Sequence, residues 1–382
     1  MNNTFSKSTL SANPGLPGDH QYKGITSPIY VSSAYDYEDV NETMYPRYFN
    51  TPNQKAIVRQ LALLEHAEDG VLFSSGMAAI STCLFAVLRK GDHALIQGDL
   101  YGGTYEALVS EFGRFEIDYT FVDGTDAENF EKAIRPDTKL AFIETPSNPT
   151  LKITDISAVA SICKKHGLVS MIDNTFASPI NQNPITLGID IVTHSGTKYL
   201  GGHSDLSCGA ALASKALCAS IRHSALHFGG SLNGISCYLL ERSLKTLALR
   251  VRQQNANAQA IAEFLHAHSA ISQVYYPGLR DHPGHNVASA QMPGGFGGML
   301  SFEVPGNAST FIEKLRLIRR AISLGGVEST ICIPSKTSHI KMSAEERHKI
   351  GVTDQLVRLS TGIEDSGDLM RDIDQALNLT VK

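Results

Sequence analysis

The chain has 382 residues, more than one hydrophobic core usually supports, so we expect a large and a small domain. With 42% hydrophobic and 19% charged residues, its composition is that of a soluble globular α/β protein and excludes a disordered or fibrous chain. A formal net charge of -5 and the lack of a Lys/Arg run argue against nucleic-acid and membrane partners and favour a small-molecule substrate.

Two local features bear on the cellular compartment. The six cysteines show no metal-ligand spacing and mostly lie in apolar runs, so we expect reduced core residues rather than disulfides or metal ligands. From Met1 to about Tyr30 the chain is polar, with no apolar segment of the signal-peptide type. No stretch approaches the roughly 20 apolar residues that a membrane span needs. These features predict a cytoplasmic protein.

Short apolar runs alternate with amphipathic segments from about Gly70 to Thr193, a pattern typical of βαβ units around a mostly parallel sheet. Residues 1–48 lack sustained periodicity and are interpreted as an arm on a neighbouring subunit, so the large domain is predicted over residues 49–245. Asp155 or Thr154 is expected to begin a helix that Gly167 ends. The predicted strands are Ala94–Gln97, Tyr119–Asp123, Leu140–Glu144, Leu168–Asp173 and Ile189–His194.

A second, smaller α+β domain is predicted over residues 246–382. It begins with a long helical pattern that places Ile261, Phe264 and Leu265 on one face. The further segments expected there are a turn-rich stretch at Tyr276–Gly298, a strand at Met299–Val304, an amphipathic helix at Phe311–Arg319 and a helix around Leu369–Leu377.

An acid and a lysine follow two neighbouring strands of the predicted parallel sheet. Asp173 ends one strand, and Lys198 lies just beyond the next. The mouth formed by the carboxyl ends of such strands is where open α/β folds bind ligands. A carboxylate there can keep a pyridine nitrogen protonated while the lysine forms an imine, which suits pyridoxal 5'-phosphate. Taken singly, each residue is better explained as a capping acid or a surface lysine.

A small-residue turn at Phe73-Ser-Ser-Gly-Met-Ala-Ala adds an anion site to this pair. It opens a helix, and free N–H groups at a helix N-terminus favour a phosphate. The hydroxyl groups of Ser195 and Thr197 are expected to add donors for the same phosphate.

Together these residues resemble the pyridoxal-phosphate enzymes of cysteine and methionine metabolism, the group of cystathionine γ-synthase, cystathionine β- and γ-lyases and methionine γ-lyase. The resemblance implies an aspartate aminotransferase-like, fold-type I transferase fold. It extends from about Thr26 to Leu377. Its motifs are Phe73-Ser-Ser-Gly-Met-Ala-Ala, Leu100-Tyr-Gly-Gly-Thr, Glu144-Thr-Pro-Ser-Asn-Pro, Asp173-Asn-Thr-Phe-Ala, His194-Ser-Gly-Thr-Lys-Tyr, Gly202-His-Ser-Asp and Leu356-Val-Arg-Leu-Ser-Thr-Gly-Ile-Glu.

The resemblance also implies a role for each site residue. Lys198 would bind pyridoxal phosphate and move protons, Asp173 would pair with the ring nitrogen, and Tyr101 would stack on the ring. Arg358 would hold the substrate carboxylate, near Asn148 and Ser323. The remaining implied cofactor ligands are Gly76, Met77, Ser195, Thr197 and Thr175.

In such enzymes a tyrosine and an arginine of the arm reach the neighbouring subunit's site, and these positions are Tyr45 and Arg47 here. The resemblance therefore implies a dimer at minimum and a homotetramer built as a dimer of dimers. The usual Asn-Pro-Thr after this motif is altered to Asn50-Thr51-Pro52-Asn53, which changes the expected path of the arm.

Two positions depart from the cystathionine-handling pattern. Glu106 stands where an arginine for a distal carboxylate is common, and Ile322 stands where an acid is common. An anion repels a carboxylate and an isoleucine cannot pair with an ammonium, so cystathionine is disfavoured. An apolar residue at position 322 resembles methionine γ-lyase, although the cysteine typical of that enzyme is Gly103 here. An alternative is that Glu106 faces solvent and decides nothing.

The leading hypothesis is a carbon–sulfur lyase that eliminates a thiol from Cγ or Cβ of methionine, homocysteine, cysteine or cystathionine. The products are a 2-oxo acid and ammonia. The alternative is γ-replacement on an O-acylhomoserine, as in cystathionine γ-synthase or a sulfhydrylase. An inactive cofactor-binding protein is disfavoured because the implied residues are all present. A metal site is also disfavoured, because the available ligands, His203, Asp205, His282 and His285, match no established spacing.

Overall fold

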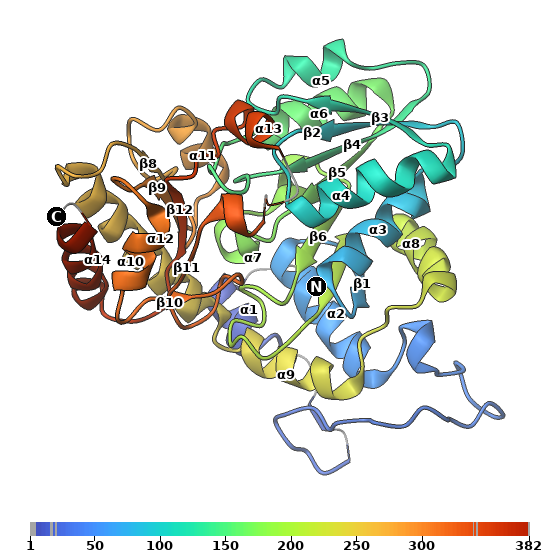
Figure 1. The fold of residues 1–382 in the computed structure, drawn as a ribbon. Helices are drawn as coiled ribbons and strands as arrows, with labels where there is room; N and C mark the ends of the chain where they lie inside the picture. The colour runs from blue at the N-terminus through green and yellow to red at the C-terminus, as the bar shows by residue number, and fades with distance from the viewer. Residues whose placement is uncertain (1–4, 16–17, 20, 339, 341–342, 381–382) are drawn as a thin grey trace.

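A computed structural model of the chain places two β-sheets side by side, each with its own helices (Figure 1). The larger sheet is formed by residues 69–213 and the smaller one by residues 274–360. The predicted fold class, a mostly parallel α/β unit with a smaller α+β unit, is confirmed. The exact division at residues 48 and 245 stays a prediction. The structure describes residues 5–15, 18–19, 21–338, 340 and 343–380.

In the described residues the larger sheet has seven strands in the order β1-β7-β6-β5-β4-β2-β3. The strands from β6 to β3 pair in parallel, while β7 runs antiparallel to both β6 and β1. The five strands predicted in this sheet are confirmed to within two residues at each end. The strands are β1 (Asp69–Phe73), β2 (His93–Gln97), β3 (Asp118–Val122), β4 (Thr138–Glu144), β5 (Val169–Asp173), β6 (Ile191–Ser195) and β7 (Gly209–Ala213).

Helices cover both faces of this sheet. Alternate side chains of a strand point to opposite faces, so in β4 Leu140 and Phe142 pack with α3, α4 and α8, while Ala141 and Ile143 pack with α2 and α6. The helices are α2 (Pro52–Glu65), α3 (Gly76–Val87), α4 (Gly102–Glu111), α5 (Glu128–Lys132), α6 (Ile156–His166), α7 (Ser178–Asn181), α8 (Lys215–Phe228) and α9 (Gly234–Leu244), with 3-10 turns η2 (Phe112–Phe115) and η3 (Pro184–Leu187).

The ends of α6 show how the sequence sets local structure. The Asp155 side chain accepts a hydrogen bond from the backbone N–H of Ala158, which satisfies one of the free donors at the helix start. Gly167 ends the helix with a φ of 67°, a left-handed conformation that glycine adopts without strain. Both predicted ends of this helix are therefore confirmed, with Asp155 rather than Thr154 as the cap.

In the described residues the smaller sheet has five strands in the order β10-β11-β12-β9-β8. Its apolar face packs against α10, α12 and α14, which lie together on one side in Figure 1. The strands are β8 (Val274–Tyr275), β9 (Met299–Glu303), β10 (Arg319–Arg320), β11 (Thr330–Cys332) and β12 (Leu356–Ser360). The helices and turn are α10 (Leu247–Ala267), α11 (His285–Gln291), α12 (Ala308–Lys314), η4 (Pro334–Lys336), α13 (Ala344–Lys349) and α14 (Ser366–Thr380).

The helix predicted at Phe311–Arg319 ends early, at Lys314. The carboxylate of Asp372 on α14 accepts the backbone N–H groups of Arg316, Leu317 and Ile318, so those donors bond to a neighbouring helix instead of continuing their own. Residues 319 and 320 then form a short strand. The turn-rich Tyr276–Gly298 stretch also contains a short helix, α11, that the sequence analysis did not predict.

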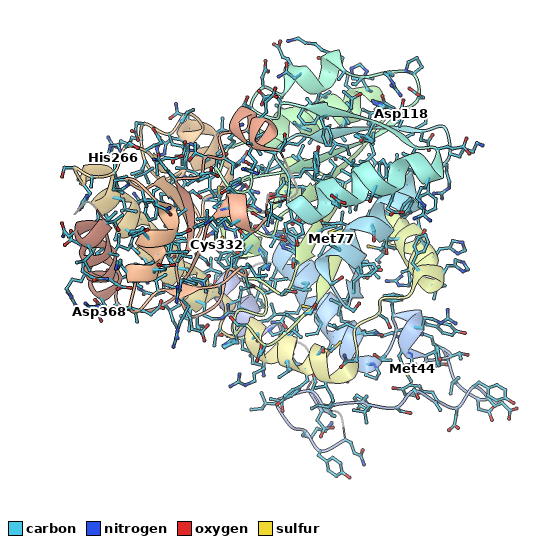
Figure 2. All side chains as sticks on the ribbon, viewed as in Figure 1. Met44, Met77, Asp118, His266, Cys332 and Asp368 are labelled. Atoms are coloured by element: carbon cyan, nitrogen blue, oxygen red, sulfur yellow. The ribbon has the colours of Figure 1, made fainter. Side chains whose placement is uncertain are left out.

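The N-terminal region combines a docked helix with an exposed, extended segment. Helix α1 (Lys7–Ala12) inserts Leu10, 2% exposed, into the core beneath the larger sheet. From residue 21 the chain forms an extended loop that projects below the body of the molecule and leads to η1 (Pro46–Tyr48), with Met44 near its end (Figure 1 and Figure 2). This segment exposes large apolar side chains, among them Tyr22, Ile25, Val31 and Tyr37. The predicted contact with a neighbouring subunit remains a prediction.

All six cysteines are buried and free of disulfides, as predicted. Burial raises the pKa of Cys163, Cys208, Cys218 and Cys237 to about 12, so these thiols stay protonated. Among the described residues, no helix is both long and apolar enough to cross a bilayer.

Candidate active site

A cavity of about 770 Å³ lies at the carboxyl ends of the parallel strands and extends toward the smaller sheet. In Figure 2, Met77 on its wall lies near the middle of the molecule, across from Cys332 in the smaller sheet. The cavity brings together most of the site residues predicted from the sequence. These are Gly76, Met77, Tyr101, Glu106, Asn148, Asp173, Thr175, Ser195, Thr197, Lys198, Ile322, Ser323 and Arg358.

The buried carboxylate of Asp173 is held by the residues that follow β5 and β6. Thr175 donates its backbone N–H at 2.9 Å and its hydroxyl at 2.5 Å to Oδ1 of Asp173, and the Thr175 hydroxyl accepts the N–H of Ser195 at 2.7 Å. Burial raises the pKa of Asp173, whereas the Thr175 bonds and the nearby His194 and Lys198 lower it. The side chain is therefore fixed, and a cation beside it would favour its charged form.

Lys198 points its amine toward the small-sheet side of the cavity. Its Nζ donates to Oγ of Ser323 at 3.2 Å, and this hydrogen bond is among those that join the larger and the smaller unit. Burial lowers the pKa of Lys198, the charge of Arg358 lowers it further, and Asp173 opposes both. A lysine in this state is more easily deprotonated, and a neutral amine is the form that attacks an aldehyde or accepts a proton.

The first turn of α3 forms a cradle without side chains. The hydroxyl of Ser75 caps the helix by accepting the N–H of Ala78 at 3.1 Å. A Cβ atom at Gly76 would lie 2.7 Å from Cβ of Ser195, and one at Gly209 would lie 2.1 Å from the carbonyl oxygen of Ser75. Glycine is thus required for this close packing. The helix N-terminus beside Ser195 has the donors that an anion needs.

Arg358 on β12 is a buried cation, 4% exposed, at the other end of the cavity. Its Nη1 donates to Oδ1 of Asn148 at 2.7 Å, and its Nη2 donates to the carbonyl oxygen of Ile322 at 3.4 Å. The sequence alone would place it on the surface. A guanidinium held in this way offers the forked geometry that recognises a carboxylate.

Glu106 and Ile322 both line the cavity, and their contact with a substrate stays a prediction. Ile322 is 74% exposed, and Lys336 of η4 borders the same space. The amine of Lys336 donates to the hydroxyl of Ser309 at 2.6 Å. The far end of the cavity therefore combines an apolar side chain with charges of both signs. We call Glu106, Ile322 and Lys336 the distal wall.

Sequence reasoning missed Glu144, a second buried carboxyl group on the cavity wall. It pairs with Asp173 in the β4–β5 register, and its Oε2 accepts the backbone N–H of Tyr101 at 2.8 Å. Burial and the nearby Asp173 raise the pKa of Glu144 well above its usual value. The same strand-end argument that selected Asp173 applies to Glu144. Lys336 had no such signal, because its approach depends on tertiary packing.

Tyr45 and Arg47 lie outside this cavity. Arg47 stacks near the rings of Tyr45 and Tyr48 and donates to the carbonyl oxygen of Leu226 at 2.7 Å. Within the described part of the chain, no group of His, Cys, Asp and Glu side chains has the arrangement of a metal site. The histidines considered as ligands make ordinary contacts: His203 with the carbonyl of Gly201, and His285 with that of Pro277.

Comparison with known proteins agrees with this geometry. The model of the family described as Cys/Met metabolism PLP-dependent enzyme matches residues 8–378. The chain belongs to this family. It is 44% identical to cystathionine gamma-lyase of Bacillus subtilis over 98% of the chain and 99% of that protein. It is 43% identical to cystathionine beta-lyase MetC of the same organism, over 92% of the chain and 91% of that protein.

A solved structure shows the same arrangement of the whole chain. Cystathionine gamma-lyase of Lactobacillus plantarum, complexed with L-serine, matches with a TM-score of 0.95 at 39% identity, over 99% of this chain and 100% of that one. The fold is therefore that of the fold-type I PLP enzymes. The cofactor of this family is pyridoxal 5'-phosphate. The cavity fits it: a buried carboxylate, a lysine of lowered pKa, an aromatic ring and a backbone cradle for phosphate line one space.

Proposed function

We propose that the protein is a PLP-dependent carbon–sulfur lyase that eliminates a thiol from Cβ or Cγ of a sulfur amino acid, releasing ammonia and a 2-oxo acid. The observation that carries the proposal is the convergence of Asp173, Lys198 and Arg358 on one cavity. The similarity to two cystathionine lyases over nearly the full chain favours elimination. Assays with methionine, homocysteine, cysteine and cystathionine test it, and formation of no 2-oxo acid from any of them would refute it.

The cofactor would be held by residues of the larger sheet. Lys198 would bind it covalently through Nζ, Asp173 would pair with the ring nitrogen, and Tyr101 would stack on the ring. The first turn of α3, with Gly76 and Met77, would hold the phosphate. Ser195, Thr197 and Thr175 complete this set, although the Thr197 hydroxyl also contacts the backbone of Cys208. When bound, pyridoxal phosphate supplies an electron sink that stabilises negative charge at the substrate Cα.

The substrate would be oriented by Arg358 and Asn148. The guanidinium holds the α-carboxylate, and the Asn148 amide fixes the guanidinium in turn. Nζ of Lys198 then takes the proton from Cα, because burial and Arg358 lower its pKa. Ser323 lies within hydrogen-bond distance of Nζ and keeps the amine in reach of this proton. Tyr101, and Tyr45 of a neighbouring subunit, are the further candidates for proton movement near the leaving group.

The distal wall bears on the choice of substrate. Glu106 alone would repel the distal carboxylate of cystathionine, but Lys336 on the same cavity supplies an opposite charge. Cystathionine therefore stays among the proposed substrates, with methionine, homocysteine and cysteine. The ranking follows from kcat/KM values measured on one preparation for all four.

The second candidate is γ-replacement on an O-acylhomoserine, since the open cavity of about 770 Å³ leaves room for a second reactant. Supplying O-acetyl- or O-succinylhomoserine with cysteine or sulfide separates the two reactions. A thioether or homocysteine product indicates replacement, whereas 2-oxo acid and ammonia indicate elimination.

We also propose a cytoplasmic homotetramer, built as a dimer of dimers. Tyr45 and Arg47 lie apart from the cavity of their own chain, beside a segment with exposed apolar side chains, which supports an arm that completes the neighbouring site. Six buried cysteines without disulfides support a reducing compartment. Light scattering of the purified protein tests the assembly, and a monomer with full activity would contradict it.

A further inference from the structure

Arg250 on α10 is a buried cation that serves neither the substrate nor the cofactor directly. It is 4% exposed, and burial lowers its pKa to about 10, so it remains charged at neutral pH. Its Nη1 donates to the carbonyl oxygen of Tyr199 at 2.8 Å, and its Nη2 to that of Ser243 at 2.9 Å. In the part of the chain that the structure describes, no carboxylate contributes to its pKa. Burying a charge costs free energy, and here the hydrogen bonds to backbone carbonyls must offset that cost.

The carbonyl of Tyr199 belongs to the turn that carries Lys198, whereas that of Ser243 belongs to α9. The N–H of Lys198 bonds to the carbonyl of Ser195, and the N–H of Gly202 bonds to the carbonyl of Lys198 at 2.7 Å, which forms a single helical turn. The carbonyls at the end of such a turn have no partner within it and carry partial negative charge. Arg250 caps this end, with Nη2 also 3.5 Å from the carbonyl oxygen of Leu200.

The same face of α10 holds the loop that carries Ser323. Gln254, one helical turn beyond Arg250 and fully buried, donates to the carbonyl oxygen of Gly326 at 2.7 Å. The N–H of Val327 bonds to the carbonyl of Gly202 at 3.0 Å. The Lys198 turn and the Ser323 loop are thus fastened to one helix and to each other. The hydrogen bond between Nζ of Lys198 and Oγ of Ser323 joins the same turn and loop that Arg250 and Gln254 attach to α10.

We propose that Arg250 is a positioning residue, which fixes the Lys198 turn against the Ser323 loop and so sets where the lysine amine stands in the cavity. This inference rests on the proposed function. Loss of Arg250 frees the turn that would hold the cofactor, whereas the contacts of Arg358 with Asn148 and Ile322 are separate from it. The effect therefore falls on cofactor retention and kcat and spares KM.

The test compares Arg250→Ala and Arg250→Lys with two controls. Arg89→Ala removes an exposed arginine that also donates to backbone carbonyls, those of Phe85 and Leu88, away from the cavity. Ile261→Ala creates a cavity in the fully buried part of α10 that faces the smaller sheet, and so destabilises the fold without touching the Lys198 turn. Each variant is measured for PLP dissociation by visible absorbance, for kcat and KM, and for melting temperature.

For Arg250→Ala we expect a PLP dissociation constant at least about tenfold higher and a kcat lower by about tenfold, with KM within about threefold of wild type. Arg250→Lys should recover part of the loss, and millimolar methylguanidinium should restore retention in Arg250→Ala. Arg89→Ala should behave as wild type. Equal loss of cofactor in Ile261→Ala at a matched drop in melting temperature, or no rescue by methylguanidinium, would overturn the proposal.

The outcomes for the proposed function are separate. Wild-type protein that binds no PLP, or forms no 2-oxo acid from the four substrates, refutes the function. Wild-type protein that does both, with an Arg250→Ala variant that retains the cofactor equally well, refutes the positioning role alone.

Discussion

The two ends of the cavity are built in different ways. At the larger sheet, Asp173 and its partner Thr175 are buried and linked by short hydrogen bonds to strand ends. At the distal wall, Ile322 is mostly exposed, and Lys336 belongs to a single 3-10 turn. Groups that must hold a reacting atom are supported by the sheet, while groups that meet the variable end of a substrate lie on connections. Changes at the first end should therefore abolish the reaction, and changes at the second should redirect it.

The largest effect should follow Lys198→Ala, because it removes both the covalent attachment and the base. We expect activity to fall by at least about a thousandfold, together with the visible absorbance of the bound cofactor. Lys90→Ala, which breaks an exposed ion pair with Glu116, is the control and should be silent. A Lys198→Ala enzyme with more than a tenth of wild-type activity would show that the sheet end does not carry the chemistry.

Asp173→Asn should lower kcat by roughly a hundredfold while the fold is kept, since the amide still accepts the Thr175 bonds but cannot balance a protonated ring. The visible spectrum should change with pH over a range different from that of wild type. Asp281→Asn, at an exposed position, controls for loss of a charge. A normal kcat would assign the pairing role to another acid, with Glu144 the first candidate.

Arg358→Lys should raise KM by about 10- to 100-fold and change kcat little, because a lysine cannot make the forked contact. Steady-state kinetics with the best substrate measure it. Arg371→Lys on α14, an exposed pair with Asp368, serves as the control. If kcat falls instead and KM stays constant, Arg358 acts on the reacting atoms and not on substrate binding.

The substitution Asp173→Asn should lower activity but increase the stability of the cofactor-free protein. Burial raises the pKa of Asp173 above 3.8, so the folded cofactor-free protein binds this proton more tightly than the unfolded chain. Stability is then lost as pH rises from about 4 through the folded pKa, and the loss is complete above it. Asp173→Asn should raise the melting temperature of cofactor-free protein more at pH 8 than at pH 4. An unchanged difference between the two pH values would contradict this.

The smallest effects belong to the distal wall. Lys336→Met should lower, and Glu106→Gln should raise, the ratio of kcat/KM for cystathionine to that for methionine, each by up to about fivefold, because solvent screens such charges. Activity on methionine itself is the internal control. A shift of both variants in the same direction would show that the two charges do not act on the same group of the substrate.

Much of the larger sheet could be predicted because its signals are local. Buried parallel strands give continuous apolar runs, and the caps of α6 lie within a few residues of the helix ends that they define. Asp173 and Lys198 were found for the same reason, since each follows a predicted strand, whereas the α3 turn was found from its small residues at a helix start. The sequence motifs then supplied Arg358, which no local pattern distinguishes from a surface charge.

The errors arise where a distant group decides the local structure. The helix at residue 311 ends because Asp372, far along the chain, takes the backbone donors that would have continued it. Helix α11 is too short for a repeating pattern to show. Lys336 and Arg250 gained their positions from tertiary packing, for which periodicity gives no signal.

The glycine contacts around α3 have a consequence for how such a scaffold changes. The backbone of Gly76 packs against Cβ and Cα of Ser195, and the backbone of Gly209 packs against the carbonyl group of Ser75, so neither position has room for a Cβ atom. Substitutions elsewhere along the cavity therefore do not move the first turn of α3. Enzymes with this fold can therefore evolve to act on a different leaving group while the binding site for the cofactor phosphate stays unchanged.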